Sequence, residues 1–457
     1  MSRIRALDAA TLERVESFVS EWLTDESVPG ASVAVVDGDD VVYCEGFGAR
    51  DLESNAPATP DTLFGVASVT KSFVAASVLQ LAADGRVAVD DPVTEYVDFY
   101  EGLDDPPTVH ELLSHSSGLP SDGASVALIS RLVGEGAETA PLSSGADLRR
   151  HVRDSLGERA TGDRFFYYNT GYTVLGTLVE AVDGRSFPEY VADEVLAPLG
   201  MDRSVVRADP RDHEDGMTPY RRTDDGVERA DFPVKGVGAA GGLLSTASDL
   251  AAYLRFAMRG DEAVLADDLR ERAQRGHVER GELLDGTAKR YGYGWMRRSF
   301  LGDDLVGHSG SLGVSSAYLG FLADAGVGVA VLANTSPAVH PTYVGPAILA
   351  VLRGEDPEDA VPFYALRAKC ERVAGTYESY RAALTADVEA AAGGLEVSVE
   401  TALGSESLTA FPESLDGGDL AFYAVDAAGE RVPVTFEAHG DHLDCYYRRW
   451  RLHEADE

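Results

Sequence analysis

The stretch FGVASVTKSF, residues 64–73, places a serine and a lysine three positions apart, at Ser68 and Lys71. Apolar side chains continue at helical spacing through residues 68–83, and the Asp-Gly pair that follows them is a typical helix stop. Side chains three positions apart on a helix share one face, so Ser68 and Lys71 are expected to meet. This pair decides which fold and which chemistry the rest of the chain has to fit.

The pair also fits nucleophilic chemistry. A serine hydroxyl is a weak nucleophile until a base removes its proton, and a lysine can do so only where burial or nearby cations favour its neutral form. The unpaired N–H groups at a helix N-terminus favour a developing negative charge. An ordinary serine and lysine on a helix is the alternative, but only four of the 39 Lys+Arg residues are lysines, which makes Lys71 unusual.

The charge of the chain excludes several partners. Its 457 residues include 77 Asp+Glu against 39 Lys+Arg, a formal net charge of −38, which repels nucleic acid and anionic membranes. The acids are spread among apolar periodic segments, which indicates an acidic shell on a folded protein. Such a composition resembles proteins of salt-loving microbes, because about 1 M salt screens charges beyond about 3 Å. We therefore expect the fold to loosen at low salt.

The cysteines and the N-terminus indicate a cytoplasmic protein. Cys44, Cys370 and Cys445 are far apart and form no CxxC motif, which argues against a disulfide framework or a zinc ribbon. The first residues lack a charged start followed by an apolar segment, so no signal peptide is expected. No run of about 18 apolar residues predicts a membrane span.

The order of predicted elements indicates an α+β domain over residues 1–355. A β-hairpin is predicted over residues 31–48, helical patterns follow, and three short strand patterns separated by glycines occupy residues 303–336. Strands at both ends with helices between them suggest that the terminal segments share one sheet. After a linker near residues 352–362, short strands every 8–12 residues predict a small β-barrel or sandwich over residues 363–457.

Two further motifs carry candidate functional groups. Tyr167 and Asn169 supply a phenol and an amide two residues apart, which an extended segment can place on one side. His308, Ser309 and Gly310 open the C-terminal strand pattern, where a glycine lets a substrate backbone approach closely. Aromatic packing and an ordinary strand edge are the alternatives, and neither motif decides the matter alone.

The three motifs together resemble one protein family. The chain carries S-x-x-K from residue 68, Y-x-N 99 residues later (167 − 68) and H-S-G 141 residues after that (308 − 167). This order is the one found in the β-lactamase and penicillin-binding-protein superfamily of serine hydrolases. The similarity is greatest to the branch with class C β-lactamases, D-aminopeptidases and family VIII esterases, and it covers about residues 10 to 350. LLSHSSGLP (112–120), AAGGLLSTASDLAAYL (239–254) and YGYGW (291–295) agree with it.

The resemblance implies a fold and an assignment for the first motifs. The fold is the β-lactamase/transpeptidase-like one, an antiparallel sheet flanked by helices with a helical subdomain. Ser68 is implied as the acylated nucleophile, Lys71 as the group that eases its deprotonation, and Tyr167 as the acid/base partner with a phenolate favoured beside Lys71. Whether Lys71 or Tyr167 takes the proton stays open, because the two are coupled. Asn169 is implied to bond Lys71 and the substrate amide.

The resemblance also assigns the third motif to substrate binding. His308 stands where the family's β-lactamases carry a lysine that recognises a carboxylate, and Ser309 and Gly310 continue this edge of the cleft. Backbone N–H groups of Ser68 and Ser311 are implied as the oxyanion hole. Because histidine is cationic only when protonated, its presence at position 308 argues against efficient β-lactam hydrolysis.

The expected activity is hydrolysis of small amides or short peptides through an acyl-enzyme, with D-amino-acid peptides as candidates. A short-chain carboxylesterase is the alternative, followed by a β-lactamase or a non-catalytic binding protein on the same fold. No cofactor is expected, and the histidines show neither HExxH nor H-x-H, so no metal is expected either. Segments 121–150 and 203–236 are expected to shape selectivity. The C-terminal domain resembles the lipocalin-like barrel of some relatives, which covers the active site or builds homo-oligomers.

Overall fold

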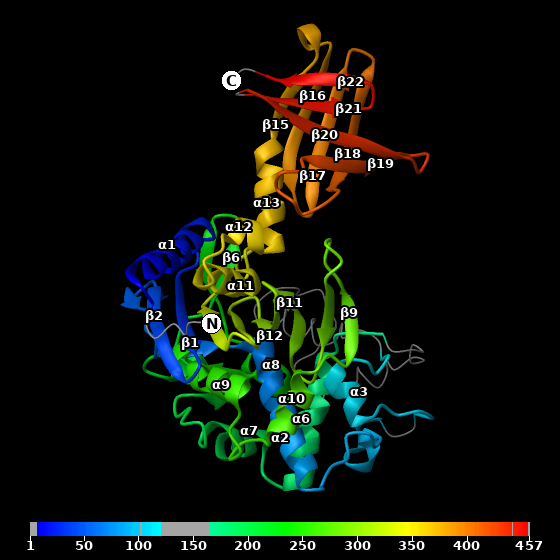
Figure 1. The fold of residues 1–457 in the computed structure, drawn as a ribbon. Coiled ribbons are helices and arrows are strands. Elements are labelled where there is room, and N and C mark those ends of the chain that lie inside the picture. The colour runs from blue at the N-terminus through cyan, green and yellow to red at the C-terminus, as the bar shows by residue number, and fades with distance from the viewer. Residues whose placement is uncertain (1–6, 101–102, 120–163, 441, 456–457) are drawn as a thin grey trace. The chain divides into compact units, whose positions relative to one another are not determined.

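The computed structural model describes residues 7–100, 103–119, 164–440 and 442–455 (Figure 1). Segment 121–150, expected to shape selectivity, therefore lies outside the described residues. The chain divides into two compact units. The first takes in residues 1–281 and 288–349, and the second takes in residues 282–287 and 350–457.

The first unit is built around a nine-stranded sheet with the order β3-β2-β1-β14-β13-β12-β11-β10-β9. Its strands are β1 (Gly30–Asp37), β2 (Asp40–Asp51), β3 (Ala56–Pro57), β9 (Val278–Glu282), β10 (Ala288–Tyr291), β11 (Met296–Phe300), β12 (Asp303–Ser311), β13 (Ser316–Leu322) and β14 (Val327–Ala333). Two smaller sheets comprise β4 (Phe64–Gly65), β8 (Leu243–Ser245) and β5 (Val205–Val206), and β6 (Tyr220–Thr223) and β7 (Gly226–Arg229).

The predicted sharing of one sheet by the two ends of the domain is confirmed. Strand β1 pairs antiparallel with β14, with Ala31 opposite Ala333 and Asp37 opposite Val327. All residues of β1, β13 and β14 are buried, so these central strands are covered on both faces. Such strands read as nearly continuous apolar runs rather than alternating ones, as ASVAVV and VGVAVLA do.

Helices pack against this sheet, and most of them lie between the hairpin and the last strands in the sequence. They are α1 (Ala9–Asp25), α2 (Thr70–Ala83), α3 (Val109–Ser114), α6 (Asn169–Asp183), α7 (Phe187–Val191), α8 (Val234–Gly241), α9 (Ala247–Arg259), α10 (Asp267–Gln274) and α11 (Pro341–Leu352). Helix α9 packs against β1, β13 and β14 (Figure 1). A capping box formed by Thr108 and Glu111 starts α3, and Thr246 caps α9.

Helix α2 is the central helix of this unit. Buried residues occur all around it, from Thr70 through Leu81, and it contacts α6, α8 and α10. A helix that is apolar on every side belongs in a core, and its alanines and serines let neighbouring elements approach. The first turn of α2, which carries Lys71, is therefore held from several directions.

The second unit is a closed eight-stranded barrel, as predicted from the spacing of short strands (Figure 1). It follows α12 (Pro357–Ala360) and α13 (Pro362–Val373). Its strands are β15 (Gly375–Glu378), β16 (Leu384–Ala391), β17 (Gly394–Thr401), β18 (Gly404–Pro412), β19 (Ala421–Val425), β20 (Arg431–His439), β21 (His442–Tyr447) and β22 (Trp450–Glu454). Strand β15 pairs with both β16 and β22, which closes the barrel.

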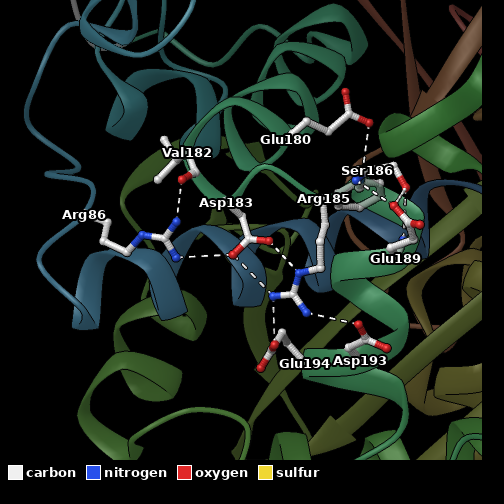
Figure 2. A network of polar contacts seen from close by, with 10 residues as sticks. Arg86, Glu180, Val182, Asp183, Arg185, Ser186, Glu189, Asp193 and Glu194 are labelled. Atoms are coloured by element: carbon white, nitrogen blue, oxygen red, sulfur yellow. Dashed lines mark hydrogen bonds and ion pairs between the residues drawn. The ribbon is translucent and has the colours of Figure 1, made fainter.

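An ion-pair network after α6 shows how the acidic shell is stabilised (Figure 2). Arg185 contacts Asp183 at 2.6 Å, Glu194 at 2.8 Å and Asp193 at 3.0 Å, and Arg86 approaches Asp183 at 3.3 Å. The hydrogen bond from Arg185 is the largest cause of the lowered pKa of Asp183. The guanidinium of Arg185 thus binds several carboxylates at once, and this arrangement fits a chain that is rich in acidic residues and poor in lysine.

None of the described helices is both long enough and apolar enough to cross a membrane.

Candidate active site

Ser68 and Lys71 meet at the start of the central helix. The sequence predicts a helix from residue 68, whereas Ala67–Val69 form a 3₁₀ turn and α2 begins at Thr70. The tighter turn still leaves Ser68 and Lys71 on one side, with Lys71 Nζ 3.0 Å from Ser68 Oγ. Ser68 is half-buried, while Lys71 is fully buried. The serine hydroxyl therefore lies where a substrate can reach it, and the lysine lies beneath it.

The lysine ammonium is held by two further acceptors. Its Nζ donates to Asn169 Oδ1 at 2.8 Å and to the carbonyl oxygen of Ala240 at 2.6 Å. The predicted bond between Asn169 and Lys71 is thus present, and it comes from the first residue of α6. These acceptors satisfy hydrogen bonds of a buried amino group, which lowers the free-energy cost of burying it.

Tyr167 lies beside this pair. Lys71 Nζ is 4.9 Å from the centre of its ring, and Tyr167 is hydrogen-bonded to Ser68. Burial raises the pKa of Tyr167 and outweighs the opposing effects of the Ser68 hydrogen bond and of Arg280. The expectation of a phenolate favoured beside Lys71 is therefore wrong for the free protein, because desolvation penalises the charged form more than the nearby cations favour it.

His115 fixes the segment that carries Tyr167. The carbonyl oxygen of His115 accepts the N–H of Phe166 at 2.8 Å, and His115 Nδ1 accepts the N–H of Tyr168 at 3.1 Å. A left-handed backbone at His115, with φ of 60°, turns both acceptors toward this segment. Burial lowers the pKa of His115, so the imidazole is neutral and carries its proton on Nε2. The backbone N–H groups of the residues before and after Tyr167 are consequently both held by His115.

His308 is buried beneath the site and does not reach its surface, with only 1% of it exposed. Its Nδ1 donates to the carbonyl oxygen of Ser309 at 2.6 Å, so Nε2 accepts from the hydroxyl of Tyr291 at 3.0 Å. Burial lowers the pKa of His308 to about 3. A neutral ring with both nitrogens occupied cannot supply the positive charge of the lysine that the family's β-lactamases carry at this position.

Gly310 brings strand β12 against the turn that carries Ser68. A Cβ at Gly310 would lie 2.2 Å from the carbonyl oxygen of Val66 and 2.9 Å from the Ser68 nitrogen, which only glycine avoids. His340 accepts the N–H of Thr342 on Nδ1 at 3.1 Å, so its Nε2–H donates to the carbonyl oxygen of Gly310 at 3.1 Å. In a trans peptide the Ser311 N–H points opposite to this carbonyl.

Arg280 on β9 adds a permanent positive charge near these groups. Its guanidinium lies 5.5 Å from the ring centre of Phe165 and interacts electrostatically with Tyr167, Tyr291 and His308. Burial lowers the pKa of Arg280, which nevertheless stays charged. Among the described residues, no carboxylate forms an ion pair with it. The site around Ser68 therefore has two basic side chains, Lys71 and Arg280, in a strongly acidic protein.

The sequence did not identify several of these groups. Ala240 acts through its backbone carbonyl, which leaves no residue-type signal, although it lies in the quoted AAGG stretch. His115 lies in the quoted LLSHSSGLP stretch, and it holds the segment of Tyr167. His340 and Arg280 belong to none of the quoted motifs, because only the fold brings β9 and the loop before α11 to the site.

Comparison with known proteins shows which family the chain resembles. The model of the Beta-lactamase family matches residues 13–352, and that of the Pab87 octamerisation domain matches residues 357–453. The solved octameric penicillin-binding protein homologue from Pyrococcus abyssi is 34% identical, covers 97% of this chain and 100% of that one, and has a TM-score of 0.89. A D-stereospecific amidohydrolase from Streptomyces is 25% identical, covers 72% and 94%, and has a TM-score of 0.58.

Curated relatives include proteins of different names. Esterase EstB from Burkholderia gladioli is 29% identical over 382 residues, which is 76% of this chain and 95% of that protein. Protein flp from Staphylococcus aureus is 26% identical over 345 residues and 73% of this chain, and the chain spans 65% of its length. The family model covers most of the chain, including the nine-stranded sheet and Ser68, so the chain belongs to the β-lactamase family.

Proposed function

We propose that the chain is a serine hydrolase that forms an acyl-enzyme on Ser68 and hydrolyses small amide or short-peptide substrates. The observation that carries this proposal is the position of Lys71 Nζ, 3.0 Å from Ser68 Oγ and held by Asn169 and Ala240. A nucleophile within hydrogen-bond reach of a base that is itself oriented by further groups is the arrangement nucleophilic catalysis needs.

The geometry supports a two-step acyl transfer. Ser68 Oγ attacks the substrate carbonyl carbon, and its proton passes to Lys71 Nζ, which takes it up in the neutral amine form while Tyr167 stays protonated. The oxyanion that forms is placed between the N–H groups of Ser68 and Ser311. The bond to the leaving group breaks as that group takes the phenol proton of Tyr167, and Lys71 passes its proton on to Tyr167. Water then attacks the acyl carbon and gives a proton to Lys71, and Ser68 Oγ leaves as it takes that proton back.

The protonated state of Tyr167 suits proton donation to the leaving group better than proton uptake from Ser68. A phenol kept neutral by burial can donate a proton to a leaving amine, which is a poor leaving group without protonation. An alkoxide leaving group needs this help less. The raised pKa of Tyr167 thus favours amide substrates, and the Streptomyces neighbour supports D-amino-acid amides in particular.

A short-chain carboxylesterase is the second candidate, supported by the likeness to esterase EstB. The two are separated by a panel of D- and L-aminoacyl amides, p-nitrophenyl esters and nitrocefin, measured in molar KCl with Ser68→Ala as the blank. We expect amide turnover that is absent from Ser68→Ala. Turnover of esters alone would favour the esterase, and no turnover above the blank for any substrate would contradict both.

We infer that the C-terminal barrel assembles the chain into a homo-octamer. The match of residues 357–453 to an octamerisation domain and the octameric Pyrococcus abyssi homologue support this. Light scattering after size exclusion in molar KCl is expected to give about eight times the 48.6 kDa chain mass. A monomeric mass under these conditions would contradict the inference.

A further inference from the structure

Three histidines gather around one carboxylate on the C-terminal barrel. His439 ends β20, His442 begins β21 and His453 lies on β22, and all three approach Asp444. They are three of only ten histidines in the chain. Strand register explains the gathering: His439 pairs with His442, and Asp444 pairs with His453.

Asp444 lies on the outer face of the barrel and is nevertheless covered completely. Its neighbours Cys445 and Leu443 belong to or pack against the barrel core, so strand alternation turns Asp444 outward. Its side chain is 0% exposed, whereas those of His442 and His453 are 51% and 56% exposed. The imidazoles therefore form an open rim over a buried carboxylate.

The carboxylate is oriented by its neighbours. Arg451 holds Asp444 Oδ2 through Nε at 2.8 Å and Nη2 at 2.5 Å. The other oxygen, Oδ1, lies 2.6 Å from His453 Nδ1 and 3.9 Å from His442 Nε2. Oδ1 is thus directed at two imidazoles.

These three donor atoms are spaced for one metal ion. The ligand atoms of His442, Asp444 and His453 all lie within 4.8 Å of one another. Tetrahedral bonds of about 2.0–2.1 Å place neighbouring donors about 3.3 Å apart. A bound ion requires the 2.6 Å pair to open by about 0.7 Å, the 3.9 Å pair to close by about 0.6 Å and a separation at the 4.8 Å limit to close by about 1.5 Å. It also requires His453 Nδ1 to give up its proton, and the two half-exposed imidazoles can rotate and lose protons to solvent.

We propose that His442, Asp444 and His453 form a binding site for a divalent transition-metal ion of the zinc, cobalt or nickel class. Two imidazoles and one carboxylate match the ligand preferences of these ions, and Mg²⁺ and Ca²⁺ prefer oxygen ligands alone. Arg451 acts as the outer partner that fixes the bound carboxylate through its second oxygen. The open rim leaves the remaining coordination positions to water.

The ligand set has no spacing motif in the sequence. Neither HExxH nor H-x-H occurs, because the donors come from two strands and meet only through the barrel register. The site revises the expectation that the histidines form no metal set. It is independent of the Ser68 chemistry, because no group of the Ser68 pocket takes part in it.

The test uses the full chain, stripped with a chelator and dialysed into molar KCl. Co²⁺ is titrated and followed by visible absorption, and Zn²⁺ is titrated by calorimetry. We expect one ion per chain, with His442→Ala and His453→Ala each weakening binding at least tenfold. His213→Ala, which removes an exposed histidine of the first unit, is the matched control and is expected to bind as the wild type does.

Two results would overturn the proposal. One is binding by the His442→Ala/His453→Ala double variant that equals wild-type binding. The other is a loss of stoichiometry or affinity in His213→Ala that is as large as the loss in His442→Ala and His453→Ala. Circular dichroism of each variant shows whether the barrel is folded, and because both imidazoles are about half exposed, their removal is expected to leave the fold intact.

Discussion

The carbonyl oxygen of Ala240 lies 2.6 Å from Nζ of Lys71 and holds the ammonium beneath Ser68. This bond, from the end of α8, directs one of the remaining N–H groups to Ser68 Oγ. We therefore predict that Lys71→Ala lowers the rate of acyl-enzyme formation at least about a hundredfold, the usual scale of proton-transfer catalysis. Stopped-flow kinetics with an activated ester measures it. Lys289→Ala, at a half-buried lysine on β10, is the control and is expected to keep the wild-type rate. A loss of rate below threefold in Lys71→Ala would show that Lys71 takes no part in the mechanism.

His340 is predicted to be a positioning residue for the oxyanion hole. Its Nε2–H holds the carbonyl oxygen of Gly310 and thereby the direction of the Ser311 N–H. His340→Ala is expected to lower kcat about tenfold with little change in KM, which is less than the loss of a whole donor. His340→Gln, which keeps an N–H donor, is expected to restore part of the rate. An unchanged kcat, or a loss seen only in KM, would contradict this role.

Arg280 is predicted to favour anionic substrates. Its charge near Tyr167 supplies the permanent cation that a neutral His308 does not. Arg280→Gln is expected to raise KM for a carboxylate-bearing ester at least tenfold and to leave a neutral ester of the same acyl group nearly unaffected. Arg290→Gln, at an exposed arginine on β10, is the matched control. Equal effects on both esters would show that Arg280 acts only through packing.

The buried histidines predict a loss of stability in acid. Burial lowers the pKa of His308 to about 3 and that of His340 to about 4, below the unfolded value of about 6.5. Between these values the unfolded chain binds more protons, so the free energy of unfolding falls as pH decreases from about 6.5. Each histidine contributes up to about 1.4 kcal/mol per pH unit. Denaturant titrations at several pH values, in molar KCl, measure the slope.

The matched variant for this slope is His308→Gln, which cannot take up the proton. Its free energy of unfolding is expected to depend less steeply on pH below about 6.5 than that of the wild type. The same slope in both proteins would show that protonation of His308 is not coupled to unfolding.

Salt is predicted to stabilise the fold. The formal net charge of −38 produces self-repulsion, which molar salt suppresses by shortening the screening length to about 3 Å. The thermal midpoint followed by circular dichroism is expected to fall, and the native signal to be lost in part, between molar and millimolar KCl. An unchanged spectrum and midpoint would contradict salt adaptation.

The sequence predicted those parts of the fold that depend on local pattern. The hairpin of β1 and β2, the capping box at Thr108, the strand pattern of β12 to β14 and the barrel strands all follow from periodicity and turn residues. The sharing of one sheet by β1 and β14 follows from connection rules. The 3₁₀ turn at Ser68 was missed, because helix signals do not separate a 3₁₀ start from an α-helical one.

The sequence predicted the parts of the site that are formed by side chains of distinctive type. It did not predict the contacts made by backbone groups or the charge states that depend on burial. Ser68, Lys71 and Asn169 meet as the motifs indicate. The charge states of Tyr167 and His308 depend on desolvation, which only the packed structure determines. The same holds for the histidines of the barrel, which strand register brings to Asp444.

Covalent labelling of Ser68 tests the central claim most directly. Full-length protein in molar KCl is treated with a fluorophosphonate, digested and analysed by mass spectrometry. We predict one adduct per chain, located on Ser68 with loss of fluoride, and no adduct in Ser68→Ala. Wild-type protein that stays unlabelled, or that is labelled to the same extent as Ser68→Ala, would contradict the assignment of Ser68 as the nucleophile.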